Sequence, residues 1–216
     1  MKLEDHGAAL HPDVADVTAL SAVLARLTPA AGLRLHAVPG LEDLVGRQSV
    51  LASIAADVIG RAARPVRAVF FDKTAESNWS LDWHQDRVIA VRARIETPGF
   101  GPWTVKAGLH HVAPPFDLLA RMVTLRVHLD DVPPGNAPLR IAPGSHRLGR
   151  IAEADVPQVV ARCGSFTCLA KRGDVWAYAT PILHASSPTT SSGHRRVLQL
   201  DYSADRLPGA LEWLGV

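Results

Sequence analysis

The segment NWSLDWHQDRVIAV, residues 78–91, places His84, Gln85 and Asp86 next to one another in an otherwise apolar, strand-like stretch. In an extended chain successive side chains point to opposite faces, so His84 and Asp86 project from the same face. Both side chains can then bind one metal ion. Two histidines and one carboxylate on one face, with other coordination positions left open, form the ligand set of non-haem iron oxygenases. This chemistry requires a second histidine from elsewhere in the chain.

His184 is the best candidate for that second histidine. It lies between an apolar strand-like segment and a Ser/Thr-rich turn, and Arg195 and Arg196 follow it after eleven and twelve residues. If this segment is a hairpin, His184 and Arg195 lie on neighbouring strands. The other histidines outside residues 121–131 lie in polar, turn or adjacent positions where solvent-facing or turn roles are expected: His6, His11, His36, His110, His111, His146 and His194.

Strand parity indicates a polar pocket lined by two further segments. In residues 121–131 an apolar set alternates with a polar set, Thr124, Arg126, His128 and Asp130. In residues 195–202 one face carries Arg195, Val197, Gln199 and Asp201, and the other carries Arg196. Side chains of one parity share one face of a strand. The two polar faces can line a common pocket, or the polar face of residues 121–131 can simply face water.

The elements that must position these residues change in character along the chain. Residues 16–27 and 41–60 have apolar residues at spacings of three and four, which predicts amphipathic helices. Short β-rich segments separated by turn residues follow: 66–72, 87–96, 121–131, 138–143, 165–170, 174–179 and 195–202. We expect a mainly β fold, a sandwich or barrel, with helices on one side. No linker divides the chain, so we expect one domain over residues 1–216, with a helical part at 1–64 and a β core at 65–216.

Composition excludes several classes of protein. The 216 residues are 47% hydrophobic and 20% charged, with a net charge of +2, and the Lys and Arg residues are scattered, which argues against a nucleic-acid binder. No apolar run has the roughly 20 residues of a membrane span, and the N-terminus lacks the apolar core of a signal peptide. Cys163 and Cys168 form neither a disulfide framework nor a zinc site. We therefore expect a reduced, cytoplasmic protein.

Several motifs in order resemble the phytanoyl-CoA dioxygenase family of Fe(II)/2-oxoglutarate oxygenases. WHQD at 83–86 resembles the family's His-x-Asp motif, and FFDKTAESNW at 70–79 resembles the segment that precedes it. LDD and NAPLRIAPGSH within 129–146 resemble its central strand and turn, and GDVWAYATPILHAS with HRRVLQLDY, within 173–202, resembles its distal His and Arg. The resemblance runs from about residue 65 to the C-terminus. It implies a double-stranded β-helix (jelly roll, cupin-like) buttressed by the N-terminal helices.

The resemblance also implies roles for particular residues. His84, Asp86 and His184 would bind Fe(II). Arg195 would form a salt bridge with the far carboxylate of the cosubstrate 2-oxoglutarate, because a planar fork of donors suits that anion. Further candidates for the cosubstrate pocket are Ser186, Arg126, Lys73 and Gln85. Arg196 has the opposite parity and is expected to be structural.

The predicted function is hydroxylation of a small molecule with O2 and release of succinate and CO2. Two alternatives remain open. One is a cupin-like metal enzyme that does not use 2-oxoglutarate, and the other is a non-catalytic binding protein with the same fold. Residues 97–120 are rich in Gly, Pro and aromatic residues, and we expect them to cover the mouth of the site. The short chain favours a small substrate.

Overall fold

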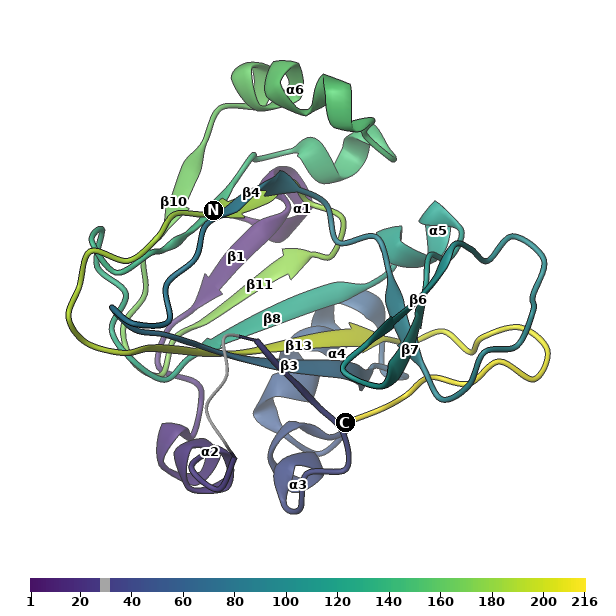
Figure 1. Cartoon of the computed structure of the whole chain (residues 1–216), viewed down its shortest axis with the longest axis horizontal. Coiled ribbons are helices and arrows are strands. Elements are labelled where there is room, and N and C mark those ends of the chain that lie inside the picture. Colours follow the sequence, from purple (N-terminus) through teal and green to yellow (C-terminus); the bar gives the residue numbers. More distant parts are fainter. Residues whose placement is uncertain (28–31) are drawn as a thin grey trace.

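The computed structural model describes residues 1–27 and 32–216. Its centre is an antiparallel six-stranded sheet with strand order β1-β11-β8-β13-β3-β2 (Figure 1). The strands in that order are Ala8–His11, Val175–Ala179, Val123–His128, Arg195–Ser203, Arg64–Lys73 and Leu33–Leu35. Strands far apart in the sequence are thus neighbours, which brings polar residues of β3, β8 and β13 together.

Two smaller sheets accompany the large one. The first has the order β10-β9-β12-β4, with strands Phe166–Cys168, Leu139–Ile141, His184–Ser186 and Leu81–His84. The second has the order β5-β7-β6, with strands Ile89–Val91, Leu109–Val112 and Trp103–Lys106. The fold is therefore mainly β, as the sequence predicts. The segment 97–120 holds the β6–β7 hairpin and a short helix, α5 (Phe116–Ala120).

Helices cover the outer face of the six-stranded sheet. Figure 1 shows α2 (Val17–Leu24) and α3 (Leu41–Val45) below this sheet, and α4 (Val50–Ile59) beside them. Their apolar residues form one core with those of β8, β11 and β13, for example Leu20, Leu51, Leu125 and Leu200. The remaining helices are α1 (Leu3–His6) and α6 (Val156–Cys163), with 3-10 turns η1 (Ser145–Leu148) and η2 (Glu153–Asp155). The predicted buttressing role of the N-terminal helices is confirmed.

Two details differ from the sequence-based expectation for the N-terminal part. Residues 41–60 form two helices rather than one, because Gly46 is extended and the Ser49 hydroxyl accepts a hydrogen bond from the Ala52 amide, which starts a new helix. Residues 1–64 also provide β1 and β2, so this part is not purely helical. Strands of three or four residues contain too few alternations to be recognised in the sequence.

The polar faces of β8 and β13 point inward. All six residues of β8 are buried, including Thr124, Arg126 and His128. The alternative that this face is exposed to water is therefore wrong. Register sets Arg126 opposite Gln199, and Gln199 opposite Val69 of β3. This inner face forms the floor of the site described below. In the described part of the chain, no helix is long and apolar enough to cross a membrane.

Candidate active site

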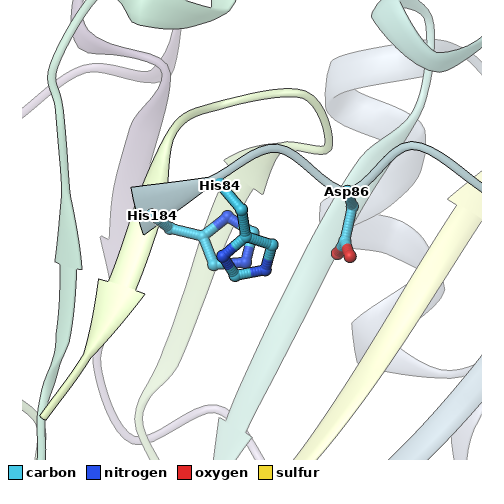
Figure 2. A group of neighbouring side chains, drawn as sticks. All are labelled: His84, Asp86 and His184. Carbon is cyan, nitrogen blue, oxygen red and sulfur yellow. The ribbon is translucent and has the colours of Figure 1, made fainter. Parts of the chain in front are cut away.

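His84, Asp86 and His184 come together on the side of the molecule that faces this polar floor. His84 ends β4 and His184 begins β12, and the two residues are paired across these antiparallel strands. Figure 2 shows the two imidazole rings close together, with the Asp86 side chain extending from the chain beyond β4 on the same side as the rings. The ring centroids lie 4.3 Å apart, and one potential ligand atom from each of the three residues lies within 4.8 Å of the others. The three residues can therefore hold one metal ion.

Both histidines are held in the form that a metal requires. Nδ1 of His84 lies 2.7 Å from the Asp82 carbonyl oxygen, and Nδ1 of His184 lies 3.0 Å from that of Ile182. A carbonyl only accepts, so each Nδ1 carries the proton and each Nε2 keeps its lone pair. Metal-binding histidines are commonly oriented in this way. Burial, together with the nearby His84, lowers the pKa of His184 to about 4, so this ring is neutral at ordinary pH.

Asp86 is ionised and held through one of its two oxygens. Its Oδ2 accepts a hydrogen bond from Gln199 Nε2 at 3.3 Å and lies 3.5 Å from Arg67 Nη2. Burial alone would raise the pKa of this carboxyl, but the charge of Arg67 and the hydrogen bond from Gln199 hold it below its ordinary value. Arg67 is anchored in turn by Asp201, at 2.7 Å. This arrangement leaves the other oxygen of Asp86 available to a metal.

A cavity of about 530 Å³ adjoins these three residues. At one end of it Lys73, Arg126, Arg195 and Ser186 are all buried. Lys73 Nζ donates to Ser186 Oγ at 3.0 Å and to the Ser187 carbonyl at 2.9 Å. Arg195 Nη1 donates to the Ala137 carbonyl at 3.3 Å, and Arg126 Nη1 donates to Gln199 Oε1 at 3.2 Å.

These three cations lack a counterion. Among the described residues no carboxylate forms an ion pair with Lys73, Arg126 or Arg195, and Nε of both arginines has no hydrogen-bond partner. Burial and the charges of Arg195 and Arg126 lower the pKa of Lys73 to about 7, and burial with Arg126 lowers the pKa of Arg195 to about 9. Buried charges are normally paired. This end of the cavity therefore fits a small dianion such as 2-oxoglutarate.

The structure places most, but not all, of the predicted residues at the cavity. Gln85 does not reach it, because alternation turns its side chain away from His84 and Asp86. Its amide bonds the carbonyls of Gly149 and Pro181 and the amide of Ile151, so it fastens neighbouring loops instead.

Arg196 also lies outside the cavity, as its parity predicts. Its guanidinium forms two bonds with the Asp130 carboxylate, at 3.0 and 2.6 Å, and its backbone amide forms a third at 2.8 Å. The buried His128 likewise does not line the cavity, and burial with the charges of Arg126 and Arg195 lowers its pKa to about 3.

Sequence reasoning missed residues that the cavity brings together: Arg34, Arg67, Trp79, Lys106 and His111. A parity signal existed for Arg67, because it shares its strand face with Val69, Phe71 and Lys73, which all line the cavity. Lys106 and His111 come from the β6–β7 hairpin, so the expectation that residues 97–120 adjoin the site is supported.

Facing antiparallel sheets with two histidines, a carboxylate and an unpaired cationic pocket between them define a metal-dependent oxygenase of the double-stranded β-helix class. The family model described as phytanoyl-CoA dioxygenase (PhyH) matches residues 5–197. The chain belongs to this family. It is therefore a 2-oxoglutarate-dependent non-haem iron oxygenase, with Fe(II) and 2-oxoglutarate as cofactor and cosubstrate and a small molecule and O2 as its other reactants. No curated protein sequence matched the chain.

Solved structures share the fold. EctD from S. alaskensis, in its apoform, superposes with a TM-score of 0.71 at 19% identity, covering 99% of this chain and 78% of its own. AviO1 from Streptomyces viridochromogenes Tue57 has a TM-score of 0.66 at 22% identity, with coverages of 96% and 94%. HygX from Streptomyces hygroscopicus, with nickel and 2-oxoglutarate bound, has a TM-score of 0.65 at 16% identity, with coverages of 93% and 84%. The predicted double-stranded β-helix is confirmed.

Proposed function

We propose that this protein hydroxylates a small molecule while it converts 2-oxoglutarate and O2 to succinate and CO2. The observation that carries the proposal is the position of the three candidate ligands, His84, Asp86 and His184, beside a buried cationic pocket that has no carboxylate of its own. Iron bound to these ligands would supply the activation of O2 and the oxidation of the substrate.

The protein's part in binding iron is to hold the ligands in place beforehand. The carbonyls of Asp82 and Ile182 fix the two imidazole rings so that both Nε2 atoms point to one place. Arg67 and Gln199 hold Oδ2 of Asp86 and keep the carboxylate ionised. The ligand side chains are therefore already oriented before iron binds, which reduces the cost of binding.

The protein's part in binding 2-oxoglutarate is to neutralise and orient its far carboxylate. Arg195 is the main candidate, because it is 2% exposed and presents a planar fork of donors with an unused Nε. Lys73 adds a second charge, and Ser186 adds a hydroxyl that already accepts a hydrogen bond from it. Arg126 adds a third charge from the floor of the cavity. The burial of all four residues keeps water from competing for the anion.

Two measurements test the proposed function. Anaerobic protein with Fe(II) should develop a charge-transfer absorbance when 2-oxoglutarate is added, and addition of O2 with a panel of candidate metabolites should release succinate in substrate-dependent amounts. His184→Ala provides the negative control. Product formation without succinate would instead indicate a metal enzyme that does not use 2-oxoglutarate. Iron binding with no turnover of any compound would indicate a binding protein.

A further inference from the structure

The cavity is lined by more cationic side chains than the binding of iron and 2-oxoglutarate requires. Among the residues that the structure describes, one carboxylate lines it, that of Asp86. Six cationic side chains line it: Arg34, Arg67, Lys73, Lys106, Arg126 and Arg195. A dianionic cosubstrate would roughly offset the charge of a bound Fe(II). Three of the six, Lys73, Arg126 and Arg195, belong to the cosubstrate pocket, and Arg67 is engaged by Asp86 and Asp201. Arg34 and Lys106 are left without a role in binding iron or 2-oxoglutarate.

These cations form two separate groups. Lys73 lies opposite Arg195 across β3 and β13, and both belong to the cosubstrate end. One row of paired residues crosses strands β2, β3, β13 and β8. In that order the residues are Arg34, Val69, Gln199 and Arg126. Three strand spacings of roughly 4.8 Å separate the backbone of Arg34 from that of Arg126 by about 14 Å. Arg34 therefore belongs to the opposite end of the cavity.

The β6–β7 hairpin completes the second group. Lys106 ends β6 and His111 lies on β7, and both line the cavity. Lys106 is exposed, Arg34 is half-buried and His111 is buried, so this end reaches from the opening into the interior. Arg34, Arg67 and Lys106 all line this cavity. Partial burial and the charges of Arg34 and Arg67 lower the pKa of Lys106, which agrees with that placement.

Arg34 and Lys106 differ from Arg67 in having no ion pair with a carboxylate of the described residues. Arg67 is already engaged by Asp86 and Asp201. In residues 1–27 and 32–216, neither Arg34 nor Lys106 forms an ion pair. Arg34 on the edge strand β2 and Lys106 on β6 thus lie on other elements than the cosubstrate pocket, and they are available to a ligand that enters from solvent.

We propose that Arg34 and Lys106 bind an anionic group of the substrate, a carboxylate or a phosphate, at the opening of the cavity. This inference rests on the proposed function, because it assigns 2-oxoglutarate to the opposite end. A substrate anchored there by its charge would extend its uncharged part past His111 towards His84 and His184, where oxidation would take place.

Calorimetric titration of the protein loaded with Ni(II) and saturating 2-oxoglutarate tests this inference, since nickel prevents turnover and 2-oxoglutarate blocks the other cationic end. The probes are hexanoate, hexyl phosphate, hexan-1-ol and hexylamine, which share one alkyl chain and differ in the head group. At least one of the anions should bind about tenfold or more tightly than the alcohol and the amine, equivalent to about 1.4 kcal/mol. Added KCl should reduce this preference. Comparison of hexanoate with hexyl phosphate shows which anion the site prefers.

Two double variants show where the preference originates. Arg34→Gln with Lys106→Gln should abolish it. 2-Oxoglutarate should still bind within about twofold of the wild-type affinity, because neither residue lies on β3, β8 or β13, the strands that carry Lys73, Arg126 and Arg195. Arg61→Gln with Lys171→Gln removes the same charge from exposed positions outside the cavity and should retain the preference.

Equal binding of all four probes, no binding of either anion, or an unchanged preference in the Arg34/Lys106 variant would overturn the inference. Failure of the proposed function is seen separately, as a failure of the wild-type protein to bind 2-oxoglutarate in the loading titration that precedes the probes.

Discussion

Each candidate metal ligand has a neighbour that fixes its tautomer or its charge. The two histidines donate from Nδ1 to carbonyls two residues earlier, and Asp86 is kept ionised by Arg67. Since the pKa of His184 is lowered to about 4, protonation of this ring does not compete with a metal at neutral pH. The site is therefore organised by the protein itself.

Replacement of a ligand should abolish iron binding without unfolding the protein. His84→Ala, Asp86→Ala and His184→Ala are each expected to weaken Fe(II) binding by more than about 100-fold, since loss of even an outer partner costs 10–100-fold. Anaerobic metal titration measures this, and circular dichroism checks the fold. His110→Ala is the control, because His110 does not line the cavity. If His184→Ala kept full metal binding, another histidine would have to be the ligand, and His111 is the other one that lines the cavity among the described residues.

Arg195 and Arg196 should differ sharply in their effect on 2-oxoglutarate. Truncation of one partner in a buried charge pair costs roughly 2–5 kcal/mol, so Arg195→Ala should raise the dissociation constant about 30-fold or more. Arg196→Ala should change it less than about threefold, since that side chain binds Asp130 outside the cavity. Titration of the anaerobic iron-loaded protein, followed by charge-transfer absorbance, measures both. Equal losses would indicate general electrostatics instead of a specific salt bridge.

Lys73 should make 2-oxoglutarate binding depend on pH. Its pKa of about 7 in the free site means that it is partly neutral at pH 7 and mostly neutral at pH 9. A dianion favours the protonated form, so binding should take up protons and weaken as pH rises from 6 to about 9. Calorimetry in buffers of different ionisation enthalpy measures the uptake. Lys73→Met should bind more weakly at pH 6 and lose most of this pH dependence; an unchanged profile would exclude Lys73 from the pocket.

Among the elements, the β6–β7 hairpin carries two cavity residues, Lys106 and His111, on strands that a strained turn connects. Lys106 pairs with Leu109, and Ala107 and Gly108 between them have φ values of 51° and 77°. Positive φ at both central positions defines a type I′ turn, which prefers Asn-Gly. Alanine at the first position is unfavourable because its Cβ crowds the backbone there.

Ala107→Asn should therefore stabilise the protein. Relief of the left-handed strain is expected to raise the free energy of unfolding by about 1 kcal/mol, because asparagine tolerates this conformation. Ala107→Val should lower it, since a β-branched residue suits positive φ least. Urea unfolding compares the two variants with the wild type. Equal stabilities of the Asn and Val variants would mean that the turn does not hold this conformation.

At the scale of the whole molecule, the proposed ligands join segments that are distant in sequence. His84 and Asp86 flank the end of β4, His184 begins β12, and the floor beneath them comes from the six-stranded sheet. Ligands that bind only the folded state stabilise it by mass action. Iron and 2-oxoglutarate should therefore hold the two facing sheets together.

Loading with metal and 2-oxoglutarate should raise the thermal midpoint. At about 100 times the dissociation constant a ligand adds roughly 2.7 kcal/mol, equivalent to about 5–10 °C for a chain of this size. Differential scanning fluorimetry with Ni(II) and 2-oxoglutarate measures the shift, and EDTA should reverse it. His184→Ala should show no shift. A shift that persisted in that variant would place the stabilising metal elsewhere.

The sequence by itself determined the residues that share a strand face. Period-two alternation is local, so it paired His84 with Asp86, separated Arg195 from Arg196 and predicted the polar face around Arg126. The mainly β class followed in the same way from many short alternating segments. The breakdown of 41–60 into two helices depended on a local cap at Ser49, which the apolar spacing did not show.

Only the tertiary structure decided which faces meet. Three features join separate segments: the pairing of His84 with His184, the contact of Arg67 with Asp86, and the placement of Lys106 and Arg34 in one cavity. Alternation within one strand carries no information about its partner strand, so it predicted none of these contacts. The family resemblance implied that His84 and His184 meet, but not the other two. Whether the polar face of β8 meets water or a cavity was open for the same reason. The register across β2, β3, β13 and β8 answered it, because it placed Arg126 on the buried floor and Arg34 at the opposite end.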